Sequence, residues 1–412
     1  MRSLIRVFPG LIAAIGLLYR LGPTSPVSAH SERERAREVC AGVHRDVSLP
    51  LPQLEAAEYI RMDGRATGYV GGLYPNGSNV PSAAHAAAAL EAAARITPLN
   101  SQGDPDPSGG RIVLISVGMS NAQMEFQGFM DLGHGDPEIN PSLTITNGAL
   151  SGQTADRWVN SEALAWTELD ARLERAEVTH LQVQVAWVKQ TLLGGGDFPD
   201  KARELQAALG DIVRNLKSRF PNLRIAFLSS RTRSFLYDRG ISPEPVAFET
   251  GFAVRWLIEE QINGEAELNF DPERGEVVAP VLVWGPYLWV DGMNPRPDGL
   301  IWTPEDLTED CTHPSPGGRE KVAGLLMAFF KTDPLAAGWF LAARAQPSFE
   351  PPSTPTEAAT ARPTAAASPT AHPAATRPAS TDGDDPSSVA TVAALLAILL
   401  VGGYLWIRSR PA

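Results

Sequence analysis

The feature that most constrains the fold of this chain is an alternation of short apolar runs with segments of helical periodicity. Helical patterns occupy residues 161–176, with Ser161 as a candidate N-cap, residues 200–218 and residues 248–262. Runs that are apolar on both faces predict a parallel sheet covered by helices on both sides. We therefore expect an α/β fold, a three-layer α/β/α sandwich. The apolar runs of strand length are Ile112–Val117, Leu143–Thr146, Leu181–Val188, Leu223–Ser229 and Pro280–Trp284.

Composition excludes several classes of protein. The 412 residues carry 35 basic and 47 acidic side chains, so the net charge is −12, which argues against nucleic-acid binding through phosphate neutralisation. Cys40 and Cys311 are the two cysteines of the sequence. Four-cysteine zinc ribbons and cysteine-ligated iron–sulfur clusters are therefore excluded, and one disulfide is the most that can form.

The N-terminus has the features of an export signal. Arg2 and Arg6 precede the apolar stretch Val7–Tyr19, and the small-residue tripeptide Val27-Ser28-Ala29 offers a cleavage site. We interpret residues 1–29 as a signal peptide, with a retained membrane anchor as the alternative. Either reading predicts that the body of the protein is exported.

The C-terminus predicts a membrane anchor. Residues 389–407 contain no charge and have the length of one transmembrane helix, and Arg408 and Arg410 follow them. This basic end places the tail, 408–412, in the cytoplasm and the body outside, in a single-pass protein of the cell membrane. A cleaved lipid-anchor signal is the alternative, but it would lack the basic stop. In residues 346–388, Pro, Thr, Ala and Ser fill 32 of 43 positions, which predicts an extended stalk.

Two glycine-containing turns follow the first two predicted strands. The first strand continues into Gly118-Met119-Ser120-Asn121, where a serine hydroxyl can enter the crevice at the carboxyl end of the sheet. The second strand continues into residues 147–154, whose Ser151-Gly152-Gln153-Thr154 turn can expose backbone N–H groups to the same crevice. Alone, the first could be a helix cap and the second a plain glycine-rich loop.

A third candidate segment lies late in the body, at Asp310-Cys311-Thr312-His313. Pro316 suits the first position of a helix capped by Ser315, so Asp310 and His313 should be held in a rigid loop at that helix's N-terminus. Together the three segments supply a nucleophile, oxyanion donors, a base and an acid that orients the base.

These three segments resemble the first, second and fifth sequence blocks of the SGNH-hydrolase superfamily, the GDSL-type esterases, over residues 111–331. Gly118-Met119-Ser120-Asn121 is also similar to the Gly-Gln-Ser-Asn of sialate and carbohydrate O-acetylesterases, with Met119 in place of glutamine. The resemblance implies a flavodoxin-like SGNH hydrolase domain over residues 111–345, preceded by an N-terminal extension, residues 30–110.

The resemblance also implies the roles of individual residues. Ser120 would be the nucleophile, His313 the general base and then acid, and Asp310 the group that orients the imidazole. The backbone N–H groups of Ser120 and Gly152 would bind the oxyanion. The implied reaction is ester hydrolysis through an acyl-serine, and it requires no metal or other cofactor.

The chain departs from the superfamily at its third block. An asparagine is expected there as a further oxyanion donor, but residues 185–190 read Val-Ala-Trp-Val-Lys-Gln. Lys189, or else Gln190, could donate in its place, unless Lys189 merely points to solvent. We also expect Asn121, Gln153 and Trp187 to contact the substrate.

Two further expectations concern the surroundings of the site. In an oxidising compartment Cys40 and Cys311 could form a disulfide that fastens the N-terminal segment over the catalytic loop, unless both are separate buried thiols. Aromatic residues near the fifth strand could stack on a sugar ring or could pack in the core. They are Trp284, Tyr287, Trp289 and Trp302.

The sequence thus predicts a surface-anchored serine esterase that acts on short acyl groups, such as acetyl, of extracellular ester substrates including glycans. One alternative is a catalytically weak polysaccharide-binding module of the same fold. The other is a lipase or thioesterase for longer acyl chains.

Overall fold

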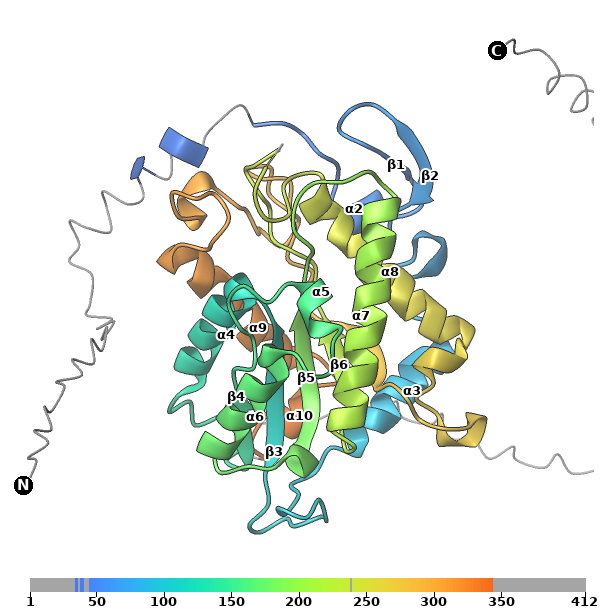
Figure 1. The fold of residues 1–412 in the computed structure, drawn as a ribbon, viewed down its shortest axis with the longest axis vertical. Helices are drawn as coiled ribbons and strands as arrows, with labels where there is room; N and C mark the ends of the chain where they lie inside the picture. Colours follow the sequence, from blue (N-terminus) through green and yellow to red (C-terminus); the bar gives the residue numbers. More distant parts are fainter. Residues whose placement is uncertain (1–33, 36–37, 41–43, 238, 344–412) are drawn as a thin grey trace, which may run out of the picture. The chain divides into compact units, whose positions relative to one another are not determined.

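A computed structural model describes residues 34–35, 38–40, 44–237 and 239–343. A five-stranded parallel sheet lies at its centre, in the order β4-β3-β5-β6-β7 (Figure 1). This is the strand order 2-1-3-4-5 of flavodoxin-like folds. The strands are β3 (Ile112–Gly118), β4 (Leu143–Thr146), β5 (Val183–Lys189), β6 (Ile225–Leu228) and β7 (Val281–Trp284).

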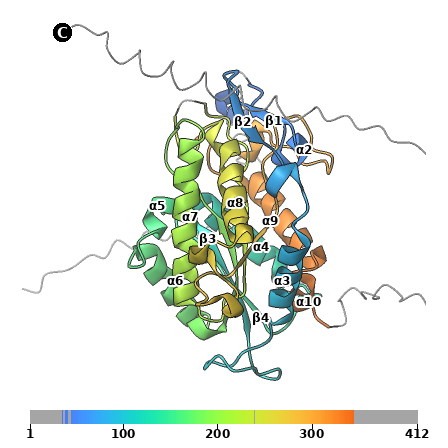
Figure 2. The same cartoon turned by 90° about the vertical axis from the view of Figure 1, so that its right-hand side faces the viewer.

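Each predicted apolar run matches one of these strands to within two residues at each end, and every residue of β3, β5, β6 and β7 is buried. Helices cover both faces of the sheet, which confirms the expected three-layer sandwich (Figure 2). One face packs against α5 (Ala155–Trp158), α6 (Leu164–Arg175), α7 (Asp200–Arg219) and α8 (Val246–Asn263). The other packs against α3 (Ala83–Ala94), α4 (Ser120–Gly133), α9 (Pro316–Thr332) and α10 (Ala337–Phe340).

The described part of residues 30–110 adds structure outside this sheet. β1 (Glu58–Ile60) and β2 (Ala66–Val70) form an antiparallel pair, α2 (Leu51–Leu54) precedes them, and α3 packs against β6 and β7. The described residues also form short 3-10 helices: η1 (Pro75–Gly77), η2 (His180–Gln182), η3 (Ala266–Leu268), η4 (Pro272–Arg274) and η5 (Pro304–Asp306).

One helix start differs from its prediction. Ser161 does not cap α6, because the backbone N–H of Ala163 donates to the carbonyl of Asn160 in a preceding turn, and the helix begins at Leu164. Ser315, by contrast, caps α9 as predicted: its hydroxyl accepts from the N–H of Gly318, and Pro316 is the first helical residue.

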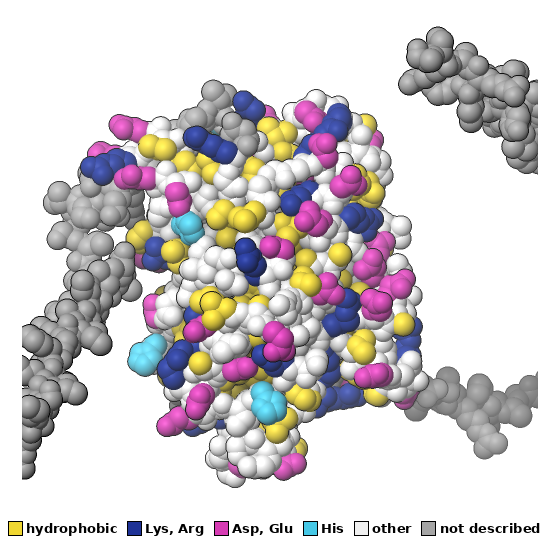
Figure 3. All heavy atoms as spheres, in the orientation of Figure 1, with side chains coloured by type: hydrophobic (Ala, Val, Ile, Leu, Met, Phe, Trp, Pro, Cys, Tyr) yellow, Lys and Arg dark blue, Asp and Glu magenta, His cyan; other side chains and the backbone are white. Residues whose placement is uncertain are grey.

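The predicted signal peptide (1–29), stalk (346–388), membrane helix (389–407) and tail (408–412) lie outside the described residues. Within the described part of the chain, no helix combines the length and the hydrophobicity needed to cross a bilayer. On the face shown in Figure 3, acidic and basic side chains are interspersed, so no extended surface of one charge lies there.

Candidate active site

The candidate nucleophile lies at the junction of β3 and α4. Ser120 is the first residue of α4, where the positive end of the helix dipole favours negative charge. The junction is tight enough to require a glycine: a Cβ atom on Gly118 would lie 2.4 Å from the Cβ of Ala122 and 2.7 Å from the carbonyl oxygen of Lys189. Ser120 is 5% exposed, so little of it meets water.

His313 reaches this serine from the loop between η5 and α9. Its Nε2 lies 2.7 Å from the Oγ of Ser120, and its Nδ1 lies 2.5 Å from the Oδ2 of Asp310. With the proton on Nδ1 bound to the carboxylate, Nε2 is free to accept the serine proton. The His313 side chain remains 26% exposed, so this Ser–His–Asp arrangement is open to solvent.

The loop holds Asp310 in its charged form. Burial opposes ionisation, but hydrogen bonds to His313, to the Thr308 hydroxyl and to the backbone N–H groups of Thr312 and His313 outweigh it and hold the pKa of Asp310 well below its usual range. Asp310 is therefore a carboxylate at any pH at which the protein would work. It can orient the imidazole and stabilise its protonated form.

The second predicted loop lies against the first. The N–H of Leu150 donates to the carbonyl of Gly118 at 3.1 Å, and Nη1 of Arg172 donates to the carbonyls of Asn147 and Ala149. Gly152 is exposed and has a φ of 75°, a left-handed conformation that suits glycine. Its role as an oxyanion donor stays a prediction.

The side chain of Lys189 is not in the crevice, contrary to the prediction. It is fully buried, and its Nζ lies 2.7 Å and 2.5 Å from the two carboxylate oxygens of Glu125 on α4. Burial lowers the pKa of Lys189 to about 8, although Glu125 favours its charged form. An ammonium bound in this way below the surface cannot donate to an ester oxygen.

Two of the three predicted substrate contacts are also wrong. Trp187 is fully buried, stacks on Phe126 and donates its indole N–H to the Oγ of Ser229. Asn121 is fully buried as well, and its Nδ2 donates to the carbonyl of Thr312 at 2.6 Å, which links α4 to the His313 loop. Gln153 is partly exposed, so its contact with substrate stays a prediction.

The aromatic residues near β7 belong to the core rather than to a sugar-stacking surface. All four are at most 7% exposed, and their polar atoms have partners inside the protein. The indole N–H groups donate to the carbonyls of Leu73 and Leu288 and to Glu244, and the tyrosine hydroxyl accepts from the N–H of Leu51. The residues are Trp284, Tyr287, Trp289 and Trp302.

Cys40 and Cys311 form a disulfide, as predicted. Cys311 lies between Asp310 and His313 and has a φ of 56°, which is unusual for a residue with a side chain. Both cysteines are almost fully buried, at 1% and 3% exposure. The bridge therefore fastens the segment around Cys40 to the loop that carries the candidate base.

Sequence reasoning missed two charged residues that support the site. Glu125 neutralises Lys189, and its spacing with Ala122, Phe126 and Phe129 on the buried face of α4 was a signal that it needed an internal partner. Arg172 on α6 donates hydrogen bonds to two carbonyls of the second loop, but no motif in the sequence indicates this contact.

Within the described residues, one group of side chains has the composition of a metal site. Ligand atoms of His44, Asp46 and Asp291 lie within 4.8 Å of one another. Asp291, however, accepts hydrogen bonds from Arg233 at 2.6 Å and from Asn294 at 2.9 Å, so protein groups already neutralise this carboxylate. We assign no metal to this group.

Comparison with known proteins does not identify a family. No family model matches the chain, and neither does any curated protein sequence. Among solved structures, similarity is found to a carbohydrate esterase family 3 protein from Talaromyces cellulolyticus, with a TM-score of 0.30 and 12% identity, covering 52% of this chain and 94% of that one. It is also found to the periplasmic domain of a Salmonella lipopolysaccharide acetyltransferase, with a TM-score of 0.29 and 10% identity, covering 54% and 84%.

A protein from Arabidopsis thaliana gives a TM-score of 0.28 and 12% identity, covering 50% of this chain and 67% of that one. Similarities at this level carry no argument about activity.

Proposed function

We propose that this chain is a serine ester hydrolase of the SGNH type. The observation that supports it is the continuous set of contacts from Ser120 Oγ to His313 Nε2 at 2.7 Å and from His313 Nδ1 to Asp310 Oδ2 at 2.5 Å. Nucleophile, base and orienting acid stand within hydrogen-bond reach of one another at the carboxyl end of a parallel sheet, where ligands of such folds bind.

The reaction would proceed in two steps. His313 accepts the proton of Ser120 while Oγ attacks the ester carbonyl carbon, and the protonated imidazole then gives that proton to the departing alcohol oxygen. The resulting acyl-serine is attacked by water, which loses its proton to His313. The carboxylic acid leaves and the serine recovers its proton.

The tetrahedral oxyanion would be bound by backbone N–H groups of Ser120 and Gly152. With Lys189 paired to Glu125, Gln190 is the alternative third donor. Its Nε2 lies 3.4 Å from the carbonyl of Gln153, a weak contact from which it could turn to the substrate. Removing one such donor typically lowers the rate by about 10²–10³.

The substrate class and the location rest on the sequence. The resemblance to carbohydrate O-acetylesterases favours short acyl groups on extracellular glycans. The signal-like N-terminus and the apolar stretch at 389–407 favour a domain displayed outside the cell membrane on a single helix.

The test is hydrolysis of p-nitrophenyl acetate by the purified full-length protein. We expect the Ser120→Ala and His313→Ala variants each to lose at least about 10³ of the kcat of the native enzyme, because each removes a group that takes part in the proton transfer. A fluorophosphonate should label the native protein and fail to label Ser120→Ala.

Ser218→Ala removes an exposed hydroxyl in the last turn of α7, outside the three loops of the site, and is the matched control; it should retain most of the activity. A native protein with neither turnover nor labelling would contradict the proposal and favour the polysaccharide-binding module. A series of p-nitrophenyl esters separates the other alternative: faster hydrolysis of octanoate than of acetate would indicate a lipase or thioesterase.

A further inference from the structure

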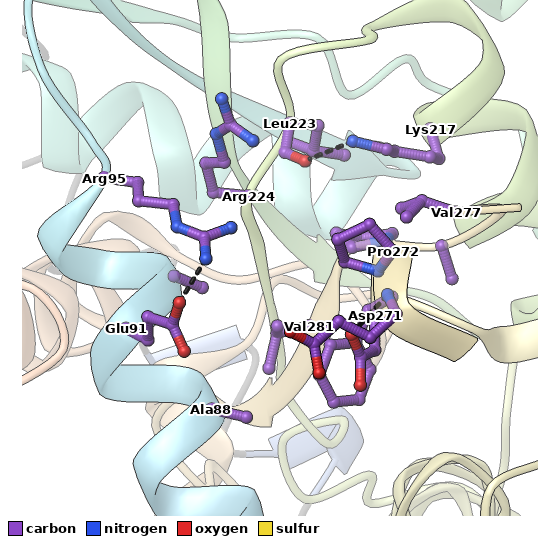
Figure 4. A pocket seen from close by; sticks show the side chains of 15 residues that line it. Ala88, Glu91, Arg95, Lys217, Leu223, Arg224, Asp271, Pro272, Val277 and Val281 are labelled. Carbon is purple, nitrogen blue, oxygen red and sulfur yellow. Dashed lines mark hydrogen bonds and ion pairs between the residues drawn. The ribbon is translucent and has the colours of Figure 1, made fainter. Parts of the chain in front are cut away.

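A cavity of about 410 Å³ lies at the amino ends of β6 and β7, and Figure 4 shows the side chains that line it. Its lining includes Arg224, which immediately precedes β6, and Pro280, which immediately precedes β7. Ser120 follows the carboxyl end of β3, and all five strands are parallel. The cavity is therefore separate from the candidate active site.

Three cations from three different elements line this cavity. They are Arg95 at the end of α3, Lys217 in the last turn of α7 and Arg224. Burial and the nearby Arg224 guanidinium lower the pKa of Lys217 to about 8, and burial with Arg95 nearby lowers the pKa of Arg224. The positive groups are thus close enough to repel one another in a partly dehydrated space.

Two of these cations have partners inside the protein, whereas the charge of Arg224 has no carboxylate partner in the described chain. Arg95 pairs with Glu91, and the Nζ of Lys217 donates to the carbonyl of Leu223 (Figure 4). The same Nζ donates to the carbonyl of Pro221. The Nε of Arg224 is buried without a hydrogen-bond partner, and in the described chain no carboxylate lies within ion-pair distance of this guanidinium. A buried donor without an acceptor raises the free energy of the folded protein, and a bound ligand with an acceptor atom would remove this cost.

The remaining lining sets the shape and chemistry of a ligand. Phe270, Pro272, Val277 and Val281 supply apolar surface. Three carboxylates also line the cavity: Glu91 pairs with Arg95, Asp271 accepts the backbone N–H of Glu273 at 2.9 Å as the N-cap of η4, and neither Asp271 nor Glu273 lies within ion-pair distance of Arg224 in the described chain. The cavity therefore combines an unpaired guanidinium with an apolar wall.

We propose that this cavity binds a small molecule in which an anionic group, a carboxylate or a phosphate, is attached to an apolar body. The anion accepts from the Arg224 guanidinium, with the Lys217 ammonium nearby, while the apolar body lies against Phe270 and its neighbours. Such a site is independent of the ester hydrolase proposed above, so either conclusion can fail without the other.

Isothermal titration of the full-length protein with phenyl phosphate, benzoate and uncharged benzyl alcohol tests the proposal. We expect at least one of the two anions to bind with a Kd below about 10 mM and benzyl alcohol not to bind. Arg224→Gln should weaken that anion at least about tenfold, because it removes a charged donor. The relative affinities of phenyl phosphate and benzoate then distinguish phosphate from carboxylate ligands.

Two variants serve as controls. Arg157→Gln removes an exposed arginine outside the cavity, and Ser120→Ala removes the candidate nucleophile; both should bind the anion as the native protein does. Loss of binding in Ser120→Ala would place the anion in the active site and overturn the proposal. So would absence of anion binding to the native protein, or unchanged binding in Arg224→Gln. If Arg224→Gln does not fold, Phe270→Ala tests the apolar wall and should weaken phenyl phosphate but not inorganic phosphate.

Discussion

The ammonium of Lys189 has no access to water, so its charge depends on Glu125. Removing one partner of a buried pair leaves an uncompensated charge, which typically costs about 3–5 kcal/mol. We expect Lys189→Met to lower the free energy of unfolding by this amount. The double variant Lys189→Met/Glu125→Met should recover part of it, since both charges of the pair are removed together, while the buried Arg231 guanidinium loses its interaction with Glu125. Urea denaturation measures both.

An exposed pair provides the comparison for this prediction. Arg157 and Asp156 are 67% and 52% exposed, and Arg157→Met should cost less than about 1 kcal/mol. If Lys189→Met costs no more than Arg157→Met, or if the double variant is no more stable than the single one, the buried pair does not have the role that its geometry indicates.

Single residues also show what could be predicted from sequence. Ser120, Asp310 and His313 are brought together as expected, because short motifs at strand and helix ends fix where their side chains lie. The predicted positions of Lys189 and Trp187 in the crevice are wrong, because both side chains are buried. Strand alternation turns both toward α4, and the partners that bury them, Glu125 and Phe126, come from a distant part of the sequence.

The loop between η5 and α9 is the element on which the proposed chemistry depends. It contains the disulfide-bonded Cys311, and its conformation is fixed further by the Asn121 amide on the carbonyl of Thr312. We expect Cys40→Ser/Cys311→Ser to lower the free energy of unfolding by about 2–5 kcal/mol. It should also lower kcat for p-nitrophenyl acetate, because His313 is held less firmly against Ser120.

A reducing agent separates this effect from a general loss of stability. At a temperature at which circular dichroism shows both proteins folded, dithiothreitol should lower kcat of the native enzyme toward that of the double variant and leave the variant unchanged. Full activity of the folded double variant would show that the loop holds its conformation without the bridge.

Elements were predicted better than their ends. Five apolar runs gave five strands within two residues at each end, because burial on both faces leaves little choice of residue types. The start of α6 was missed by three residues, since Asn160 forms a turn that competes with a cap at Ser161. The sequence does not predict the cluster of cations in the cavity of Figure 4. Arg95, Lys217 and Arg224 lie in three separate elements, and only the folded chain brings them together.

At the scale of the whole molecule, strand order explains why the candidate site forms where it does. β4 lies on one side of β3 and β5 on the other, so the chain reverses direction across the sheet between them. The crevice at the carboxyl end of such a switch point is open to ligands. Ser120 follows β3 and Gln190 follows β5, which brings the nucleophile and the alternative oxyanion donor to the same crevice.

The apolar stretch near the C-terminus predicts that the protein is attached to a membrane. We expect the full-length protein to sediment with membranes and to resist carbonate extraction, because residues 389–407 are apolar and Arg408 and Arg410 follow them. A chain that ends at residue 388 should move to the soluble exported fraction with its p-nitrophenyl acetate hydrolysis intact. Leu396→Arg, in the middle of the apolar stretch, should weaken attachment, whereas Ser387→Arg, just outside it, should not. Full-length protein in the soluble fraction, or a truncated chain still bound to membranes, would contradict the C-terminal anchor.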